Sequence, residues 1–441
     1  MQLTVFGLWH LGSVTAACMA DRGHDVVGVD PSTENIDNLN QGHAPIFEPG
    51  LDALITKGLS SGKLRFKKNE PSSFLNTELL WITFDTPVDE DDVADTNYVL
   101  KHVKNVLGFL LDESVVIISS QLPVGSIAIL ESYAKTTYPQ KSIHFVSSPE
   151  NLRLGKSIEI FLNPDRIIVG IRSDEKKLKV NELIGSITEK IEWMSVESAE
   201  VTKHAINAFL ATSVCFANEI ASVCEKVGAN AKEVERGLKT EVRIGPKAYL
   251  SPGGPFAGGT LARDLEFLKE MGEEHNIPLS LLGSVQKSND EHKAWIKRKL
   301  EEFFPMLEGV KVCVWGLTYK VGTNTLRRSL SVELCNWLLN KGASINVFDP
   351  LVKELPADWK GNIISAEEAL EALQSSDVLV IGTECPEFRD QVHRIPNIYL
   401  NRQLLVLDPS HYLEKDLLAN QFEGLHYVTV GSNFYGKSFN E

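Results

Sequence analysis

The first thirty residues, MQLTVFGLWHLGSVTAACMADRGHDVVGVD (1–30), decide the fold. Residues 2–6 are predicted to form a short buried strand, and residues 11–21 a helix. Residues 25–30 read as a second strand that ends in an acid, Asp30. A strand, a helix and a strand in this order form a βαβ unit, which indicates an α/β protein with a parallel sheet.

The pattern continues along the chain. Further strand-like runs occur at 79–84, 114–119, 142–147 and 166–170, separated by segments long enough for helical crossovers. An alanine-rich stretch from about 198 to 227, without glycine or proline, predicts an unusually long helix. A second βαβ opening starts with a strand at 311–315 and ends at Asp349, after the strand 344–348. We therefore expect two Rossmann-like, doubly wound parallel-sheet domains joined by a long central helix.

Composition narrows the class of protein. The chain has 441 residues, about three times a typical domain of ~150 residues, so two or three domains are expected. Lys and Arg total 44 against 59 Asp and Glu, and the net charge of −15 makes nucleic acid and membrane surfaces poor partners. The six cysteines include no CxxC pair, so neither a metal site nor a disulfide framework is predicted. With no apolar run near the ~18 residues of a membrane span, we expect a cytoplasmic protein.

The turn after the first strand carries the first functional signal. It reads Gly7-Leu8-Trp9-His10-Leu11-Gly12, where a dinucleotide-binding fingerprint would be GxGxxG. The first glycine serves the tight turn and the last serves helix packing, whereas the middle position, which lets a pyrophosphate approach, is Trp9. Asp30 is placed to accept ribose hydroxyls and favours NAD over NADP.

More words of this kind lie along the whole chain. They are NQGHAPIFEPGL (40–51), FDTP (84–87), SQLPVGS (120–126), SPENLRLGKSIEIFLNPDRIIVG (148–170), KHAINAFL (203–210), FANE (216–219), RIG (243–245), PFAGGTLARD (255–264), GLTYK (316–320), FDP (348–350) and GTECPEF (382–388). In this order and spacing they closely resemble the UDP-glucose/GDP-mannose dehydrogenase family over nearly the entire chain.

The resemblance implies an activity and a domain plan. Members of that family oxidise C6 of a nucleotide-linked hexose from alcohol to aldehyde to carboxylate with two NAD, and an active-site cysteine forms a thioester on the way. The implied plan is an N-terminal NAD-binding Rossmann-like domain at 1–197, a central helical dimerisation region at 198–300, and a C-terminal UDP-binding Rossmann-like domain at 301–441. A UDP-sugar substrate, a homodimer through the central helix and a place in polysaccharide precursor synthesis are also implied.

The resemblance also assigns site residues. Lys203 and Asn207, four residues apart on one helix face, would bind the sugar and stabilise the developing oxyanion, and Glu150 and Asp264 would handle protons and water. The residues expected to bind the cofactor are Gly7, Trp9, His10, Leu11, Gly12, Asp30, Thr86, Gln121 and Arg327. The residues expected to bind the substrate are Lys203, Asn207, Arg243, Tyr249, Gly258 and Lys320.

The chain departs from the family pattern at positions that serve the oxidation of the aldehyde to the carboxylate. Thr260 stands at the position of the nucleophilic cysteine, and a threonine hydroxyl is a far weaker nucleophile at neutral pH. Leu154, Gln121 and Asn35 stand where a glutamate, a threonine and a basic residue are expected. We therefore predict that the thiol-dependent second oxidation is impaired. Cys215 is weighed as a displaced nucleophile, but a buried structural thiol is favoured.

Three functions remain open from the sequence. The first is an NAD-dependent oxidoreductase acting on a UDP-hexose. The second is a nucleotide-sugar epimerase that uses a retained NAD to oxidise and re-reduce the sugar. The third is a non-catalytic UDP-sugar-binding protein, suggested by Trp9 and Thr260. The first is favoured because Asp30 and Arg327 are retained.

Overall fold

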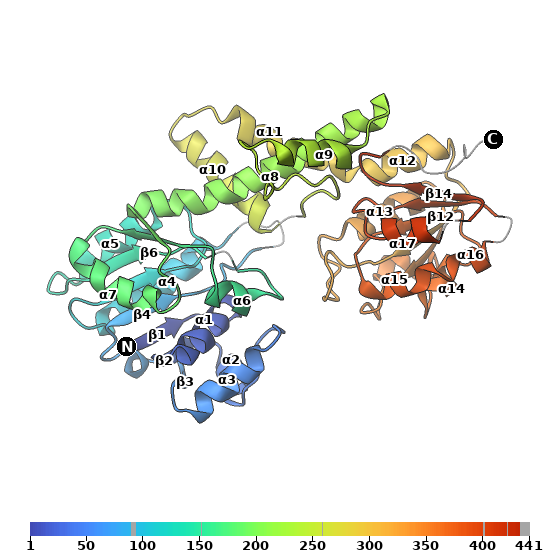
Figure 1. The fold of residues 1–441 in the computed structure, drawn as a ribbon. Coiled ribbons are helices and arrows are strands. Elements are labelled where there is room, and N and C mark those ends of the chain that lie inside the picture. The colour runs from blue at the N-terminus through green and yellow to red at the C-terminus, as the bar shows by residue number, and fades with distance from the viewer. Residues whose placement is uncertain (90–93, 151, 258, 400–401, 421, 433–441) are drawn as a thin grey trace. The chain divides into compact units, whose positions relative to one another are not determined.

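The computed structural model describes residues 1–89, 94–150, 152–257, 259–399, 402–420 and 422–432. The chain forms two compact units, Met1–Ile206 and Asn207–Glu441, and the long helix α8 (Val196–Val227) contains the boundary between them. Within each unit, helices cover both faces of a mostly parallel sheet (Figure 1). The expectation of two α/β parallel-sheet domains with a long central helix is confirmed.

The first unit contains an eight-stranded sheet in the order β3-β2-β1-β4-β5-β6-β7-β8. Its strands are β1 (Gln2–Phe6), β2 (Asp25–Asp30), β3 (Leu64–Lys68), β4 (Leu79–Ile82), β5 (Val115–Ile118), β6 (His144–Ser147), β7 (Ile167–Ile171) and β8 (Ile191–Met194). Its helices before α8 are α1 (His10–Asp21), α2 (Thr33–Asn40), α3 (Leu51–Ser60), α4 (Thr96–Val106), α5 (Ser126–Thr137), α6 (Ser157–Leu162) and α7 (Asp174–Gly185).

Two strands, β7 and β8, run opposite to the other strands of this sheet, which differs from the expected parallel sheet. β7 pairs antiparallel with β6, through Val146 with Ile171 and Ser147 with Gly170. The segment between these strands therefore starts and ends at the same edge of the sheet, the edge at which β1, β4 and β5 also end. This keeps Pro149 and Glu150 on the edge where α/β proteins bind their ligands.

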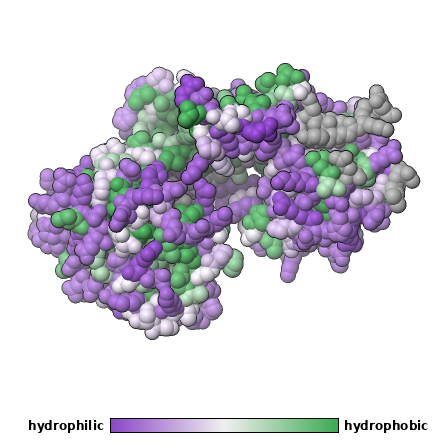
Figure 2. Space-filling view, in the orientation of Figure 1, coloured by the Kyte–Doolittle hydropathy of each residue, from purple (hydrophilic) through white to green (hydrophobic). Residues whose placement is uncertain are grey.

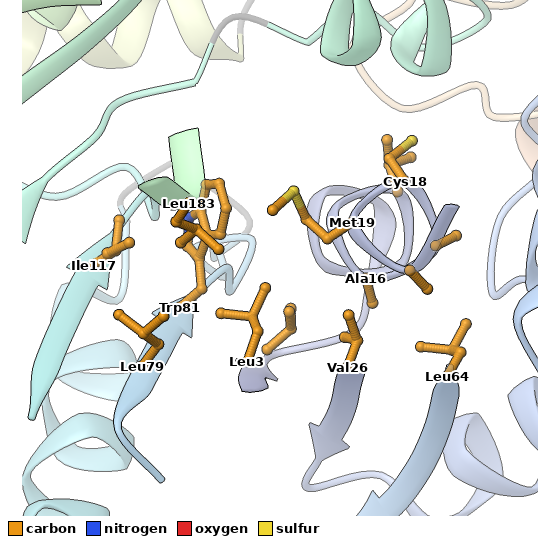
Figure 3. Packing of buried hydrophobic residues seen from close by; sticks show 14 of the residues in the cluster. Leu3, Ala16, Cys18, Met19, Val26, Leu64, Leu79, Trp81, Ile117 and Leu183 are labelled. Carbon is orange, nitrogen blue, oxygen red and sulfur yellow. The ribbon is translucent and has the colours of Figure 1, made fainter. Parts of the chain in front are cut away.

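The core of this sheet follows the two-residue period of its strands. Leu79 and Trp81 of β4 belong to the cluster that packs on the α1 side, whereas Leu80 and Ile82 belong to the cluster on the opposite face. Figure 3 shows side chains of several strands pointing toward α1, with Met19 of that helix facing them. Burial on both faces explains why these strands read as continuous apolar runs in the sequence.

The second unit contains a six-stranded parallel sheet in the order β11-β10-β9-β12-β13-β14. Its strands are β9 (Lys311–Trp315), β10 (Ser344–Phe348), β11 (Ile363–Ser365), β12 (Val378–Ile381), β13 (Leu404–Leu407) and β14 (Leu425–Val428). Its helices after α8 are α9 (Ala231–Thr240), α10 (Thr260–Glu274), α11 (Ser280–Lys293), α12 (Trp295–Phe303), α13 (Leu330–Asn340), α14 (Ala369–Leu373), α15 (Pro386–Val392), α16 (Ile395–Ile398) and α17 (Glu414–Ala419).

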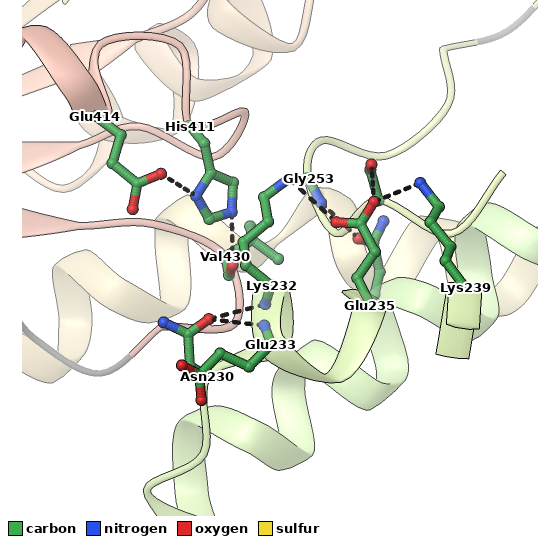
Figure 4. Close-up of polar contacts among 11 residues, drawn as sticks. Asn230, Lys232, Glu233, Glu235, Lys239, Gly253, His411, Glu414 and Val430 are labelled. Atoms are coloured by element: carbon green, nitrogen blue, oxygen red, sulfur yellow. Dashed lines mark hydrogen bonds and ion pairs between the residues drawn. The ribbon is translucent and has the colours of Figure 1, made fainter. Parts of the chain in front are cut away.

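A cluster of polar contacts ties α9 to the end of this sheet (Figure 4). Asn230 caps α9 by accepting the backbone N–H of Lys232 at 2.9 Å. His411 contacts the Val430 carbonyl at 2.9 Å and a Glu414 oxygen at 3.2 Å. The backbone N–H of Ala231, the first residue of α9, donates to the Gly431 carbonyl at 2.7 Å, and this bond joins the segment after β14 to the start of α9.

The helix α8 has an unexpected property. By length and composition it is apolar enough to cross a membrane, with an 18-residue window of mean hydropathy 1.3, whereas the sequence analysis expected no such run. Core helices of globular units pass the same test. In the second unit Asn218 of α8 accepts the backbone N–H of Gly253 at 3.0 Å, which is the behaviour of a helix packed against protein.

The loop that precedes α10 is tied to α11 through His292. Its Nε2 lies 2.8 Å from the Gly253 carbonyl, so Nε2 carries a proton and donates it. Burial lowers the pKa of His292 from its ordinary value of 6.5, although the hydrogen bond to Gly253 opposes this. The unfolded chain therefore binds the second ring proton, which charges the imidazole, more tightly than the folded chain does.

We expect the free energy of unfolding to fall as pH drops below about 6.5, because protonation then favours the unfolded state. His292→Gln, which keeps a donor for Gly253 but takes no charge, is expected to lose less stability between about pH 7 and pH 5. Urea denaturation at each pH measures the difference. Equal pH dependence of the two proteins would contradict the assignment. His24 and His411, whose pKa values burial also lowers, contribute to a remaining slope.

Candidate active site

The turn after β1 has the backbone geometry of a dinucleotide-binding loop. Gly7 has a φ of +96°, and a Cβ at Gly7 would meet the backbone nitrogen of Phe84 at 2.8 Å. A Cβ at Gly12 would lie 1.7 Å from the Gly7 carbonyl oxygen. Trp9, at the middle position, is 47% exposed and makes no side-chain cap for α1, whereas Leu11 is buried. The two outer glycines are therefore fixed by sterics, and the middle position carries a bulky exposed ring.

Asp30 braces this turn. It lies at the end of β2 as predicted and is buried. Its carboxylate accepts the N–H of Leu8 at 2.6 Å and the N–H of Ser32 at 2.8 Å. Burial raises the pKa of Asp30, and these two hydrogen bonds oppose the rise. The acid thus sets the shape of the loop, and each oxygen keeps a second lone pair for a ribose hydroxyl. The glycines and Asp30 together fit a bound dinucleotide.

His10 belongs to a cluster that the sequence analysis missed. Its Nε2 lies 3.0 Å from a Glu48 oxygen and 3.1 Å from the Ser157 hydroxyl. Glu48 also accepts the N–H groups of Gly155 at 2.8 Å and Ser157 at 2.9 Å. Burial raises the pKa of Glu48, but these hydrogen bonds outweigh it and hold the pKa below its ordinary value. The sequence signal that could have found this cluster was Glu48, which lies in the word quoted at 40–51.

Two predicted cofactor residues meet at the ends of β4 and β5. The Thr86 hydroxyl donates to the Gln121 carbonyl at 2.6 Å. This contact joins two loops at the edge of the sheet where the glycine turn also lies, so both residues are near the expected cofactor.

Glu150 and Lys203 also meet in the first unit. Lys203, on α8, is only 9% exposed, and its ammonium donates to the Glu150 carbonyl at 2.6 Å and lies 3.9 Å from a Glu150 carboxylate oxygen. Both residues line a small cavity of about 30 Å³ with Ser120, whose buried hydroxyl has no hydrogen-bond partner among the described residues. The volume and the polar lining suit about one water molecule.

Sequence reasoning missed two further groups of this cavity. Glu200 accepts the N–H groups of Gly125 at 2.8 Å and Ile127 at 3.1 Å at the start of α5, and burial raises its pKa. His204 is 1% exposed and its Nε2 lies 3.1 Å from the Leu122 carbonyl. Glu200 and His204 are four residues apart on α8, on either side of Lys203 in the sequence. This helical spacing was the sequence signal that could have found them.

In the second unit, Asn207 and Asp264 form a buried pair. The Asn207 side chain donates to the Asp264 carboxylate, which is fully buried. Asp264 lies on α10, whose first residue is Thr260, exposed and one turn earlier on the same helix. The structure therefore places the hydroxyl of Thr260 and the carboxylate of Asp264 along one face of α10.

The second unit also holds a larger cavity, of about 340 Å³. It lies beyond the ends of β9 and β12, which is the point where the strand order of this sheet reverses. Asp349 braces the adjoining turn by accepting the Leu317 N–H at 2.7 Å and the Thr318 N–H at 3.3 Å, as Asp30 does in the first unit. Basic side chains line it, namely His292, Lys293, Lys297, Lys320 and Arg328, of which only Lys320 was predicted. Such a lining suits a phosphorylated ligand.

Other predicted residues lie outside that cavity. Arg243 is exposed and pairs with Glu241 at 2.9 Å, and Tyr249 is exposed. Arg327 is exposed on the segment between β9 and α13. Gly258 lies outside the described residues. The assignments of these residues to substrate or cofactor stay predictions.

The cysteines lie in the core of the structure, where burial suppresses the reactivity of most of them. All six are buried. Burial raises the pKa of Cys18 and Cys335 to about 12 and that of Cys385 to about 11, and it also raises the pKa of Cys215. A thiolate is the reactive form, so these residues are unreactive near neutral pH. In the described part of the chain, no group of three His, Cys, Asp or Glu could hold a metal ion.

Comparisons with known proteins match nearly the whole chain. Three models of the UDP-glucose/GDP-mannose dehydrogenase family match it: the NAD binding domain at residues 1–188, the central domain at 197–291 and the UDP binding domain at 313–415. A UDP-glucose 6-dehydrogenase of Rhizobium meliloti is 33% identical over 438 residues, which cover 98% of this chain and 99% of the relative.

Two further proteins that are similar to this chain are also UDP-glucose dehydrogenases. A UDP-glucose 6-dehydrogenase of Bacillus subtilis is 30% identical over 98% of this chain and 93% of its own. The structure of a UDP-glucose dehydrogenase from Pyrobaculum islandicum superimposes with a TM-score of 0.80 at 27% identity, covering 92% of this chain and 93% of that one.

Proposed function

This chain belongs to the UDP-glucose/GDP-mannose dehydrogenase family, and from that membership we propose that it oxidises a UDP-hexose with NAD as its cofactor. One observation carries the proposal. The NAD-binding model matches the first unit and the UDP-binding model matches the second. Each unit has a glycine turn at the point where its strand order reverses, and an aspartate holds that turn, Asp30 in the first unit and Asp349 in the second. Such turns receive nucleotide ligands in α/β folds.

The Lys203–Glu150 and Asn207–Asp264 pairs support alcohol oxidation. NAD, when bound, supplies the hydride acceptor. The Lys203 ammonium, held beside Glu150, is suited to stabilise a developing oxyanion. Asp264, held by the Asn207 amide, is suited to take the alcohol proton. We propose these roles for the four residues.

The second oxidation, from aldehyde to acid, is proposed to be impaired. It needs a nucleophile that forms a cleavable acyl intermediate, and the exposed Thr260 hydroxyl is a weak one. Cys215, weighed as a displaced nucleophile, is buried, and burial raises its pKa, which disfavours the thiolate at that position. Reduced buried thiols also support the prediction of a cytoplasmic protein.

The test is incubation of the purified protein with UDP-glucose and NAD. The proposal expects about one NADH per sugar and a carbonyl product that a hydrazine reagent traps, with little uronate. About two NADH per sugar and a uronate product would contradict the impaired step. Epimerised sugar without net NADH, with nicotinamide released on denaturation, would instead support an epimerase. Calorimetric binding of UDP-sugar without NAD binding would support a non-catalytic protein.

The surface of α8 supports the proposed homodimer. Phe209, Phe216 and Val223 are 70%, 46% and 57% exposed and follow one another at intervals of seven residues. That spacing keeps three large apolar side chains on one helix face, the pattern of a helix that packs on a partner helix. Figure 2 shows apolar surface over the C-terminal part of α8.

We expect Phe216→Asp to convert the protein from dimer to monomer, because it would bury a charge in the proposed interface. Light scattering after gel filtration measures the mass. Val242→Asp, which places the same charge on a side chain that is 91% exposed in the segment after α9, is the matched control and is expected to leave the mass unchanged. A monomeric native protein, or a dimer that Phe216→Asp leaves intact, would exclude this face.

A further inference from the structure

Asp85 follows β4 at the switch point of the first sheet. β1 and β4 are parallel neighbours, and the chain leaves the first into the glycine turn and the second into residues 83–85. These two segments touch, because a Cβ at Gly7 would lie 2.8 Å from the backbone nitrogen of Phe84. Since ligands of α/β proteins bind in the crevice at this point, Asp85 stands at the cofactor turn.

The carboxylate of Asp85 faces the N-terminus of α1. It lies near the backbone N–H groups of Leu11 and His10, which are the first donors of that helix, and these N–H groups lower the pKa of Asp85. Trp9 at the N-cap position supplies no side-chain cap, so the negative charge nearest these open donors is that of Asp85. In dinucleotide-binding folds the pyrophosphate occupies this place. An anion of the chain's own therefore stands where the anion of the cofactor is received.

The second unit places an acid in the same way. A Cβ at Gly316 would lie 2.6 Å from the backbone nitrogen of Thr383, just as Phe84 approaches Gly7. The residue after Thr383 is Glu384, and it lines the ligand cavity of that unit. The corresponding residue of the first unit is Asp85. Its position at the ligand side of the turn thus follows from the shared backbone plan.

The groups around Asp85 have opposite effects on its pKa. Surrounding protein atoms desolvate its carboxylate and raise its pKa, although the residue keeps an exposed face. His10 lowers that pKa by attraction and Glu150 raises it by repulsion. An ionised Asp85 repels an incoming pyrophosphate and occupies its donors. A protonated or displaced Asp85 does neither.

We propose that Asp85 competes with the pyrophosphate of NAD for the start of α1, and that it thereby sets both the affinity of this chain for NAD and the pH dependence of that affinity. The proposal rests on the proposed function, because it requires NAD to bind at the glycine turn. Affinity is highest when Asp85 is protonated and falls as the pH rises through its pKa. By linkage, bound NAD raises the pKa of Asp85.

The experiment is calorimetric titration of the full chain with NAD between about pH 5.5 and pH 8.5. Asp85→Asn keeps an oxygen that can accept the helix N–H groups but removes the charge. We expect it to bind NAD about tenfold more tightly than the wild type at the upper pH, and with a shallower dependence on pH. Asp37→Asn, which makes the same charge change on the exposed surface of α2, is the control and is expected to behave as wild type.

The outcomes separate this proposal from the proposed function. Equal NAD affinity in wild type and Asp85→Asn, or an equal pH slope of NAD affinity in the two proteins, overturns the competition by Asp85. Failure of both proteins to bind NAD at every pH overturns the cofactor site and the competition with it. Tighter binding by Asp85→Gly as well, with an unchanged melting temperature in the absence of NAD, supports the competition.

Discussion

Replacement of Thr260 by cysteine is expected to raise the yield from about one to about two NADH per UDP-hexose and to convert the carbonyl product into a uronate. The exposed first position of α10 would then carry a thiol one turn from the buried Asp264 carboxylate. The N-terminus of a helix lowers the pKa of a cysteine, which favours the reactive thiolate. Product analysis by mass spectrometry together with NADH absorbance measures both quantities.

Two variants control this result. Thr260→Ser keeps a hydroxyl and is expected to give no uronate. Thr240→Cys adds an exposed thiol at the end of α9 and is also expected to give none. If Thr260→Cys fails to form uronate while it still produces NADH, the block lies elsewhere, and Gln121, Leu154 and Trp9 become the next residues to revert.

Lys203→Ala is expected to lower kcat/KM for NADH formation by about 10² to 10³, the loss typical of one oxyanion-stabilising donor. Its ammonium is nearly buried and fixed at 2.6 Å from the Glu150 carbonyl, so no solvent ion replaces it easily. Steady-state kinetics with UDP-glucose measure the loss.

The matched control lies on the same helix. Lys226→Ala removes a lysine whose side chain is 72% exposed, and activity is expected to stay within about twofold. A Lys203→Ala protein with near-normal kcat/KM would remove Lys203 from the catalytic residues. Circular dichroism of both variants shows whether α8 has kept its helix.

The sequence predicted the fold where local patterns decide it. Leu79 to Ile82 read as a strand because every residue is apolar, and the structure buries them on two opposite faces. The turn at Gly7 was recognised because only glycine adopts its backbone without strain. The direction of β7 was not predictable, since a strand's sequence does not state whether its partner runs parallel or antiparallel to it.

The candidate site was predicted in part. The resemblance named Glu150, Lys203, Asn207 and Asp264, and each of them contacts another in its own unit. The resemblance did not indicate the basic lining of the second cavity, because Lys293 and Lys297 come from a helical segment far along the chain from Lys320. Asp85 was present in the quoted FDTP word, but its approach to α1 depends on the pairing of β1 with β4, which is a tertiary fact.

The braced turns have a consequence for how nucleotides exchange. Asp30 and Asp349 hold their loops through backbone N–H groups that belong to the chain itself, so each turn has its shape before any ligand arrives. A preorganised loop loses little conformational entropy when a nucleotide binds. The association rate of the nucleotide is then governed by diffusion and orientation. Differences in affinity between two nucleotides at these turns are then expected in the dissociation rate, because each lost contact speeds release of the nucleotide.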